Sequence, residues 1–420
     1  MNHKFRPHSP GTQSERLRIL VIHNEYAQIS GEETSLQHVI DLLKSRGHDI
    51  LCYQRSSAEI ENSRLGRTKA FFSGMYSVSS RNELKNIIKH AIPDVVFIKN
   101  LYPLISPSVL PVISQAGIPV IMWVANYRMM CPTGLYASRG KICERCNDGR
   151  EYWCVLKNCA NSLPKSFGYA LRNSVARTAG WYRKHVSAFI CASEFLKGKL
   201  IAAGFEESRI HAVPNHVPDV GGPYMEMEQE SSSGSYVGYV GRISSEKGIS
   251  TLLQAAALCP SIEFQLAGRR NLSDPVTDPI PSNVQFAGFK KGTELSDFYR
   301  HSRFVVSTSN CYETFGMSVA EAMLHRRAVI VPRIGVFPEW VTEPVNGLIF
   351  EPGNARQLAD RIGRLWNNPH LCKAMGQAGR KIALQRYSAD AYYDRFLKIA
   401  EQLVSPPAAC KQGKRKRSAA

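Results

Sequence analysis

The chain carries two successive series of strand and helix patterns, separated by a polar segment. The first series begins with LRILVIHN at Leu17 and continues through PDVVFIKN at Pro93 and IPVIMWVA at Ile118. The second begins with YVGYVGR at Tyr236 and runs through RAVIVPR and GLIFEP. Between them, residues 218–235 are rich in Gly and Ser, a composition typical of a linker. Alternating buried strands and helices predict an α/β chain with two doubly wound parallel sheets that face a central cleft.

The length and the ends of the chain set limits on its organisation. A chain of 420 residues is too long for one compact core and suits two. No run approaches the ~18 apolar residues that cross a bilayer, and the N-terminus lacks the apolar core of a signal peptide, so we expect a cytoplasmic protein. The predicted organisation is a disordered N-terminus (1–16), an N-terminal Rossmann-like domain (17–217) with an insert (128–162), the linker (218–235), a C-terminal Rossmann-like domain (236–385), a helix that packs back toward the N-terminal domain (386–405) and a basic tail (406–420).

The chain has a formal net charge of +18 at pH 7. This excess favours an anionic partner such as a phosphorylated substrate, lipid headgroups or a nucleic acid, although a solvated basic surface is an equally plain explanation. Only the tail KQGKRKRSAA favours nucleic acid, and we expect no nucleic-acid binding. The stretch from Lys165 to Lys184 interleaves basic and aromatic residues, which is typical either of an interfacial helix on an anionic membrane or of an ordinary packed helix.

Two cations follow the first strand of the second series. In YVGYVGRISSEKG, Arg242 and Lys247 come between a glycine turn and the start of a helix near Lys247–Ser250. Backbone N–H groups and the helix dipole favour an anion at such a place, and two cations neutralise it, so the segment suits a diphosphate. The alternative is that both are ordinary surface residues beside a turn.

Two glutamates follow a later strand of the same series. After RFVVSTS, Glu313 lies in a loop and Glu321 lies eight residues later, on a helix that we expect to begin near Met317. The backbone of residues 315–317 would present free N–H groups to an anion. Taken alone, Glu321 could simply stabilise the helix dipole and Glu313 could be a solvated loop carboxylate. Their combination with the paired cations favours a binding site.

These segments resemble the large retaining glycosyltransferase family four, which has the GT-B fold. The matching pieces are GYVGRISSEKG, LAGRR, FAGF, SNCYETFGMSVAEAM and VPNHV, with HNEYAQISGEET and DVVFIKNLYPLISPSVL in the first series. The resemblance covers about residues 17–403. It implies a retaining, hexosyltransferase-type enzyme that moves a sugar from a UDP- or GDP-sugar to a glycan or lipid-linked acceptor, in polysaccharide or glycoconjugate biosynthesis. If the acceptor is lipid-linked, we expect the protein to be peripheral to the membrane, on its inner face.

The resemblance also implies roles for individual residues. Glu313 corresponds to the catalytic carboxylate that contacts the donor sugar, and Glu321 to the carboxylate that accepts hydrogen bonds from the ribose. The implied donor-binding set is Gly31, Arg242, Lys247, Gly268, Phe289, Phe315, Gly316, Met317 and Glu321. No cofactor is implied for catalysis, because fixed cations can stabilise the leaving diphosphate.

Five cysteines crowd the insert, among them the C-x-x-C pair of Cys143 and Cys146. Four thiolates at such spacing suit tetrahedral zinc, and a cytoplasmic address argues against disulfides. We predict a structural zinc held by Cys131, Cys143, Cys146 and Cys159, with Cys154 as the spare; a group of free buried thiols is the alternative. A subset of the family carries a similar insert, NYR…C…CExC…C, and its place after IMWVA suggests a role in acceptor recognition.

The chain departs from the family pattern at two acceptor-side positions. Relatives with this insert usually read HNYR, and often HN before LYP, where this chain has Ala125 and Lys99. The acceptor-side candidates are Lys99 and Asn126; Lys99 either supplies charge to the cleft or is a solvated lysine. The missing histidine is compatible with catalysis if the donor phosphate accepts the acceptor's proton. It also leaves open a catalytically inactive donor-binding or scaffold protein, while a nucleotide-sugar epimerase or hydrolase would share the same fold.

Overall fold

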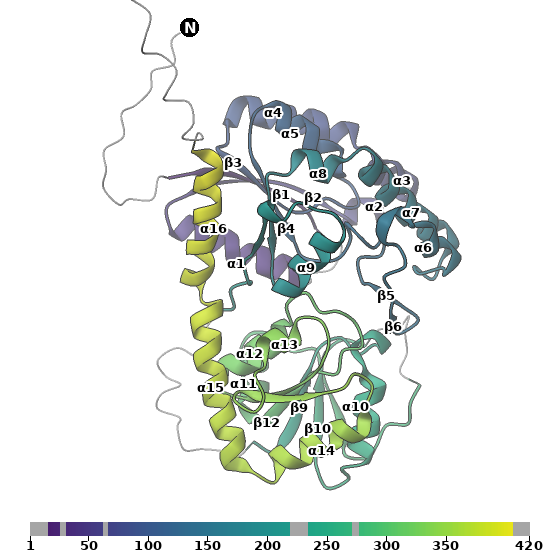
Figure 1. Ribbon diagram of the computed structural model, residues 1–420, viewed down its shortest axis with the longest axis vertical. Helices are drawn as coiled ribbons and strands as arrows, with labels where there is room; N and C mark the ends of the chain where they lie inside the picture. The colour runs from purple at the N-terminus through teal and green to yellow at the C-terminus, as the bar shows by residue number, and fades with distance from the viewer. Residues whose placement is uncertain (1–15, 26–30, 62–65, 219–233, 271–276, 406–420) are drawn as a thin grey trace, which may run out of the picture.

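The computed structural model of the chain describes residues 16–25, 31–61, 66–218, 234–270 and 277–405. The predicted N-terminus, the basic tail and nearly all of the predicted linker lie outside these residues. Two α/β domains stand one above the other, and a pair of long helices runs along one side of both (Figure 1).

The N-terminal domain is built on a six-stranded sheet in the order β2-β1-β3-β4-β7-β8, with every pairing parallel. Its strands are β1 (Arg18–Glu25), β2 (Asp49–Ser56), β3 (Val95–Asn100), β4 (Val120–Val124), β7 (Ala188–Cys191) and β8 (Ile210–Ala212). The central strands β3 and β4 are buried along their whole length, because helices cover both faces of a parallel sheet. Those helices include α1 (Gly31–Ser45), α4 (Val78–Ala91), α5 (Leu110–Gln115) and α9 (Glu194–Ala202).

The C-terminal domain repeats this architecture with the strand order β11-β10-β9-β12-β13-β14. Its strands are β9 (Tyr236–Val240), β10 (Phe264–Ala267), β11 (Val284–Gly288), β12 (Ser302–Val306), β13 (Ala328–Pro332) and β14 (Gly347–Phe350). Its helices are α10 (Ile249–Ala257), α11 (Gly292–His301), α12 (Met317–Leu324), α13 (Phe337–Trp340), α14 (Ala355–Trp366) and α15 (Pro369–Tyr387). The order reverses between β9 and β12, and ligands of such sheets bind at this point, outside the carboxyl ends of the strands.

The last helix, α16 (Ala389–Val404), returns to the N-terminal domain (Figure 1). Its Phe396 ring lies 5.2 Å from the ring centroid of Phe97 in β3, and His48 and Tyr393 share a hydrogen bond of 2.9 Å. Since α15 packs on α12 and β13 of the other domain, this helix pair ties the two domains together.

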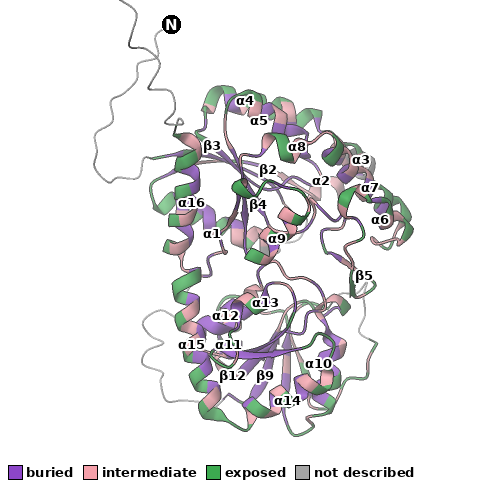
Figure 2. Ribbon diagram, in the orientation of Figure 1, coloured by how far each residue is buried: buried purple, intermediate pink, exposed green. Residues whose placement is uncertain are grey.

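The insert is compact and lies at the edge of the N-terminal domain. Its elements are β5 (Ala137–Ser138), β6 (Lys141–Ile142), a 3-10 turn (Asn147–Gly149) and α6 (Tyr152–Leu156), and α6 packs on α7 (Leu163–Thr178). Figure 2 shows buried strands at the centre of each domain and more exposed surface over α6 and α7. Two further helices, α2 (Ala58–Glu61) and α3 (Gly66–Met75), lie nearby.

The structure changes one detail of the helix pattern. The basic and aromatic stretch from Lys165 to Lys184 is two helices, because Gly180 with φ +69° separates α7 from α8 (Trp181–His185). Among the described residues, none of the helices combines the length and the apolar character that crossing a membrane requires.

Candidate functional site

An ion pair that is largely shielded from water lies where β9 and β12 end. Lys247 closes the 3-10 turn Ser245–Lys247 that follows β9, and Glu313 lies in the loop between β12 and α12. Their side chains form an ion pair and are 18% and 19% exposed, and Ser309 Oγ donates to Glu313 Oε1 at 2.6 Å. Strands β9 and β12 are neighbours in the sheet, which brings together two residues that are distant in the sequence.

The pair keeps both groups charged. Burial raises the pKa of Glu313, but the Lys247 charge and hydrogen bonds from Lys247 and Ser309 outweigh it and hold that pKa below its usual value. Burial lowers the pKa of Lys247, and the Glu313 charge more than reverses this. The site therefore offers a fixed cation and a fixed carboxylate in a region shielded from water, where charges act strongly.

Glycines shape the backbone around this pair. Gly248 has φ +69°, and a Cβ there would lie 1.8 Å from the carbonyl oxygen of Thr308. Gly316 has φ +84° and leads directly into α12, which begins at Met317 as the sequence predicts. The N-terminus of α12 follows the Glu313 loop by three residues, so its free N–H groups and the helix dipole can attract an anion there.

Glu321 lies within α12 and is largely buried. Tyr299 Oη donates to Glu321 Oε2 at 2.8 Å. Burial raises the pKa of Glu321 to about 7, and the Tyr299 hydrogen bond opposes this only in part. Such a carboxylate can accept hydrogen bonds from hydroxyl groups once it is ionised.

The remaining members of the predicted donor set fall into different environments. Arg242 is 57% exposed and pairs with Glu246 at 3.1 Å, while Phe289 is 56% exposed and has the Arg269 guanidinium 4.5 Å from its ring centroid. A Cβ on Gly268 would lie 1.7 Å from the Gly241 carbonyl oxygen, so strand packing alone requires glycine there.

The side chain of Phe315 belongs to the core of the C-terminal domain. Its ring centroid lies 4.9 Å from that of Trp340, whose indole N–H donates to the Phe315 carbonyl oxygen at 2.5 Å. Met317 packs partly against the same core. The 315–317 segment can therefore meet a ligand only through its backbone. In the N-terminal domain, Gly31 is the first residue of α1, and residues 26–30 before it lie outside the described residues.

The N-terminal domain contacts the Glu313 loop directly. Tyr127 Oη donates to the Glu313 carbonyl oxygen at 3.3 Å, and Thr314 Oγ1 donates to the Ala125 carbonyl oxygen at 3.2 Å. Ser193 Oγ donates in turn to the Thr314 carbonyl oxygen at 3.2 Å. The loop is thus enclosed between the domains, at the position expected for the cleft.

Lys99 is buried, so the interpretation of Lys99 as a solvated lysine is wrong. It is only 6% exposed, its Nζ donates to the Glu32 carbonyl oxygen at 2.7 Å, and it lies 3.5 Å from the Trp123 ring centroid. Burial lowers the pKa of Lys99 to about 7, against the Glu32 and Glu33 carboxylates. Asn126, the other acceptor-side candidate, donates to Glu32 Oε1 at 3.3 Å. Both residues therefore hold the first turn of α1.

The cysteines of the insert gather but do not form a ligand set. Cys146 and Cys154 are buried in one small cluster, with Cys159 packed against it, and all are free thiols. Burial, together with the neighbouring Cys131, Cys159 and Cys143, raises the pKa of Cys146 to about 12. Within the residues that the structure describes, no three His, Cys, Asp or Glu side chains are grouped so that they could hold a metal ion. The predicted zinc ligands thus lie near one another without tetrahedral placement.

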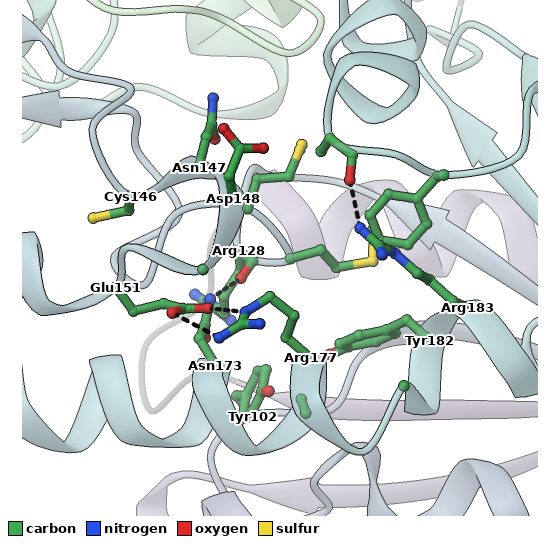
Figure 3. Close-up of a pocket in the computed structure, with 17 residues that line it drawn as sticks. Tyr102, Arg128, Cys146, Asn147, Asp148, Glu151, Asn173, Arg177, Tyr182 and Arg183 are labelled. Carbon is green, nitrogen blue, oxygen red and sulfur yellow. Dashed lines mark hydrogen bonds and ion pairs between the residues drawn. The ribbon is translucent and has the colours of Figure 1, made fainter.

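A small cavity of about 60 Å³ lies behind the insert, between it and helices α7 and α8 (Figure 3). Arg177 Nε donates to Glu151 Oε1 at 2.7 Å across it, and Asn173 Nδ2 donates to the Arg128 carbonyl oxygen at 2.6 Å. Tyr182 also lines it. Trp181 and Tyr182 of α8 also pack on the core, which favours ordinary packed helices over an interfacial helix for this stretch.

Comparison with known proteins identifies the C-terminal domain. Residues 225–382 match the family model described as Glycosyl transferases group 1, a span that includes the Lys247–Glu313 pair and Glu321. An uncharacterized glycosyltransferase of Methanocaldococcus jannaschii is 25% identical over 334 residues, which cover 78% of this chain and 88% of that protein. The C-terminal domain therefore resembles that of a glycosyltransferase family, and the chain has the two-domain GT-B fold. The capsular polysaccharide biosynthesis glycosyltransferase CapM of Staphylococcus aureus is 26% identical over 181 residues, 39% of this chain and 47% of that protein.

Two further comparisons extend the likeness. The Anabaena protein HepE, solved in complex with UDP, is 16% identical and has a TM-score of 0.63, over 92% of this chain and 100% of that one. This likeness establishes the two-domain fold. The poly(ribitol-phosphate) alpha-N-acetylglucosaminyltransferase of Staphylococcus aureus is 29% identical over 175 residues, 39% of this chain and 34% of that protein.

Several residues of the site carry no signal that the sequence analysis used. Tyr299 and Ser309 hold the two glutamates, and Glu339 accepts hydrogen bonds from the backbone N–H groups of Glu194 and Phe195, at 3.0 and 2.6 Å. Tyr127 belongs to the quoted NYR segment, which could have directed attention to it. Ser309 belongs likewise to the quoted SNCYETFGMSVAEAM segment, whereas the tertiary contacts reveal the roles of Tyr299 and Glu339.

Proposed function

We propose that this protein transfers a sugar from a UDP- or GDP-sugar to a glycan or lipid-linked acceptor, with retention of the anomeric configuration. The observation that carries the proposal is the largely shielded Lys247–Glu313 pair at the carboxyl ends of β9 and β12. It supplies a fixed cation for a diphosphate and a fixed carboxylate for a sugar, in the matched domain. HepE, a protein of similar fold, was solved with UDP and with UDP-glucose, which favours UDP.

Different residues would bind the donor diphosphate and contact the donor sugar. Lys247, helped by Arg242 and the N–H groups that begin α12, would bind the donor diphosphate and stabilise the charge that develops as it leaves. When the donor phosphate pairs with Lys247, Glu313 would lose its ion pair with Lys247. It would instead accept a hydrogen bond from a sugar hydroxyl. In attack from the same face, the departing phosphate oxygen accepts the acceptor's proton, so the protein supplies position and charge. The missing histidine at Ala125 is compatible with this mechanism.

Donor binding should stabilise the folded protein. A UDP-sugar that binds only the native state stabilises it by about 2.7 kcal/mol at a hundredfold excess over its Kd. We therefore expect a rise in melting temperature with a UDP- or GDP-sugar and none with the free sugar. Melting curves across a panel of nucleotide sugars measure this, and a panel without any shift would contradict the proposed function.

Because of Glu321, the affinity for the donor should depend on pH. Because its pKa is raised to about 7, much of it is protonated at neutral pH, whereas ribose hydroxyls bind best to the ionised form. Binding then releases a proton, and the affinity for a UDP-sugar should increase by up to about tenfold as the pH rises from about 6 to about 8. The donor phosphates are ionised throughout this range. Glu321→Gln should flatten the profile; an unchanged slope would show that Glu321 does not meet the ribose.

We also propose that the insert binds one structural zinc, which requires its thiol groups to move closer together than they lie in this structure. Five cysteines lie in this segment, and Cys146 has three further thiols within electrostatic reach. Zinc binds thiolates, and it would relieve the cost of burying several ionised sulfurs together. Purified protein should contain about one zinc per chain by elemental analysis, lost on Cys143→Ser or Cys146→Ser. The control Cys372→Ser, in the C-terminal domain, should keep it. Metal-free protein with freely titratable thiols would contradict the proposal.

A further inference from the structure

The insert reaches across the domain interface to the loop that carries Glu313. Tyr312, the residue before Glu313, donates its phenolic hydrogen to Glu144 Oε1 at 2.8 Å. Glu144 stands between Cys143 and Cys146 in the insert of the N-terminal domain. The same carboxylate oxygen accepts a hydrogen bond from Lys199 Nζ of α9 at 2.6 Å. One carboxylate therefore joins the insert, α9 and the Glu313 loop.

Aromatic packing fixes the Tyr312 ring in this position. Its ring centroid lies 4.8 Å from that of Phe195 and 6.2 Å from those of Tyr127 and Tyr136. Lys199 Nζ lies 4.8 Å from the same centroid. All four neighbours belong to the N-terminal domain. Burial, together with the Glu144 hydrogen bond and charge, raises the pKa of Tyr312 to about 12, so the phenol remains a hydrogen-bond donor.

The fold of the insert in turn fixes Glu144. The backbone N–H of Cys143 donates to the Tyr136 carbonyl oxygen at 2.8 Å, and that of Asn147 donates to the Glu144 carbonyl oxygen at 3.2 Å. Tyr136 Oη donates to Asn147 Oδ1 at 2.6 Å. The turn that carries Glu144 is thus held at both ends, so a shift of the insert would move the carboxylate that receives the Tyr312 hydrogen bond.

We propose that Glu144 is a positioning residue: through Tyr312 it holds the Glu313 loop against the N-terminal domain and so aligns Glu313 with the donor sugar. The inference rests on the proposed function for the role of Glu313. It gives the cysteine-rich insert a part in catalysis, because the insert holds Glu144 in place. A charge-assisted hydrogen bond between two domains stabilises the arrangement in which it forms.

The test compares kcat, the acceptor KM, the nucleotide affinity and the melting temperature of four variants. Tyr312→Phe removes one oxygen and keeps the ring packing. We expect Tyr312→Phe and Glu144→Ala each to lower kcat about tenfold, with the nucleotide affinity unchanged. Glu144→Gln, which keeps an acceptor without charge, should recover part of the loss. The control is Glu151→Ala, which removes an insert carboxylate paired with Arg177 inside the N-terminal domain and should lower only the melting temperature.

The combined variant decides whether the two residues act together. If Glu144 works through Tyr312, Glu144→Ala with Tyr312→Phe should lower kcat no more than either change alone. Additive losses, or full kcat in Glu144→Ala, would overturn the inference. So would a kcat that falls equally in Glu151→Ala, because it would reflect general stability. Failure of the proposed function looks different: Glu313→Gln would then keep full turnover, whatever the coupling between residues 144 and 312.

Discussion

Replacing Glu313 by Gln should lower turnover by about two to three orders of magnitude, the usual loss when a group that stabilises the transition state is removed. Nucleotide affinity should change little, because the carboxylate lies beside the expected sugar position and Lys247 remains. Gln keeps the shape of the side chain and can still accept the Ser309 hydrogen bond. Steady-state transfer rates and calorimetric UDP binding, measured on the same preparation, separate the two effects.

Glu321→Ala is the matched comparison for Glu313→Gln. Both glutamates are buried in the same domain, but Glu321 should act on the ribose and its loss should weaken nucleotide binding. If both variants transfer sugar normally and differ only in melting temperature, the two carboxylates are structural. If neither the variants nor the wild-type chain transfers sugar while all bind UDP, the chain is a donor-binding scaffold.

Lys247→Ala should impair both donor binding and stability. Loss of a charge-assisted contact to the diphosphate costs about 1.5–3 kcal/mol, so the affinity for UDP should fall about ten- to a hundredfold, while that for uridine should hardly change. The folded state should also lose about 3–5 kcal/mol, because Glu313 is left as a buried charge without its cation. Calorimetry with both ligands and urea denaturation measure the two losses.

A second substitution separates these two effects of Lys247. In Lys247→Ala with Glu313→Gln, no uncompensated charge remains, so part of the stability should return while UDP binding stays weak. If the affinities for UDP and for uridine fall equally, Lys247 does not bind the diphosphate. A stability that does not recover would mean that Lys247 supports the fold through its packing and not through the ion pair.

The sequence by itself determines the two sheets and their order along the chain. Strand β4 is a continuous apolar run and β3 begins with one, because a parallel sheet covered on both faces offers them no water. The start of α12 at Met317 follows from Gly316, whose φ of +84° suits glycine. These features depend on neighbours within a few residues, so a local pattern is enough to predict them.

Only the tertiary structure decided which of these residues meet. Lys247 and Glu313 pair because β9 and β12 adjoin in the sheet, and Lys99 is buried because α1 covers the end of its strand. The contact of Glu144 with Tyr312 requires the two domains to pack against each other as they do in this structure. A local pattern cannot encode such distances, because each depends on how segments far apart in the chain pack together.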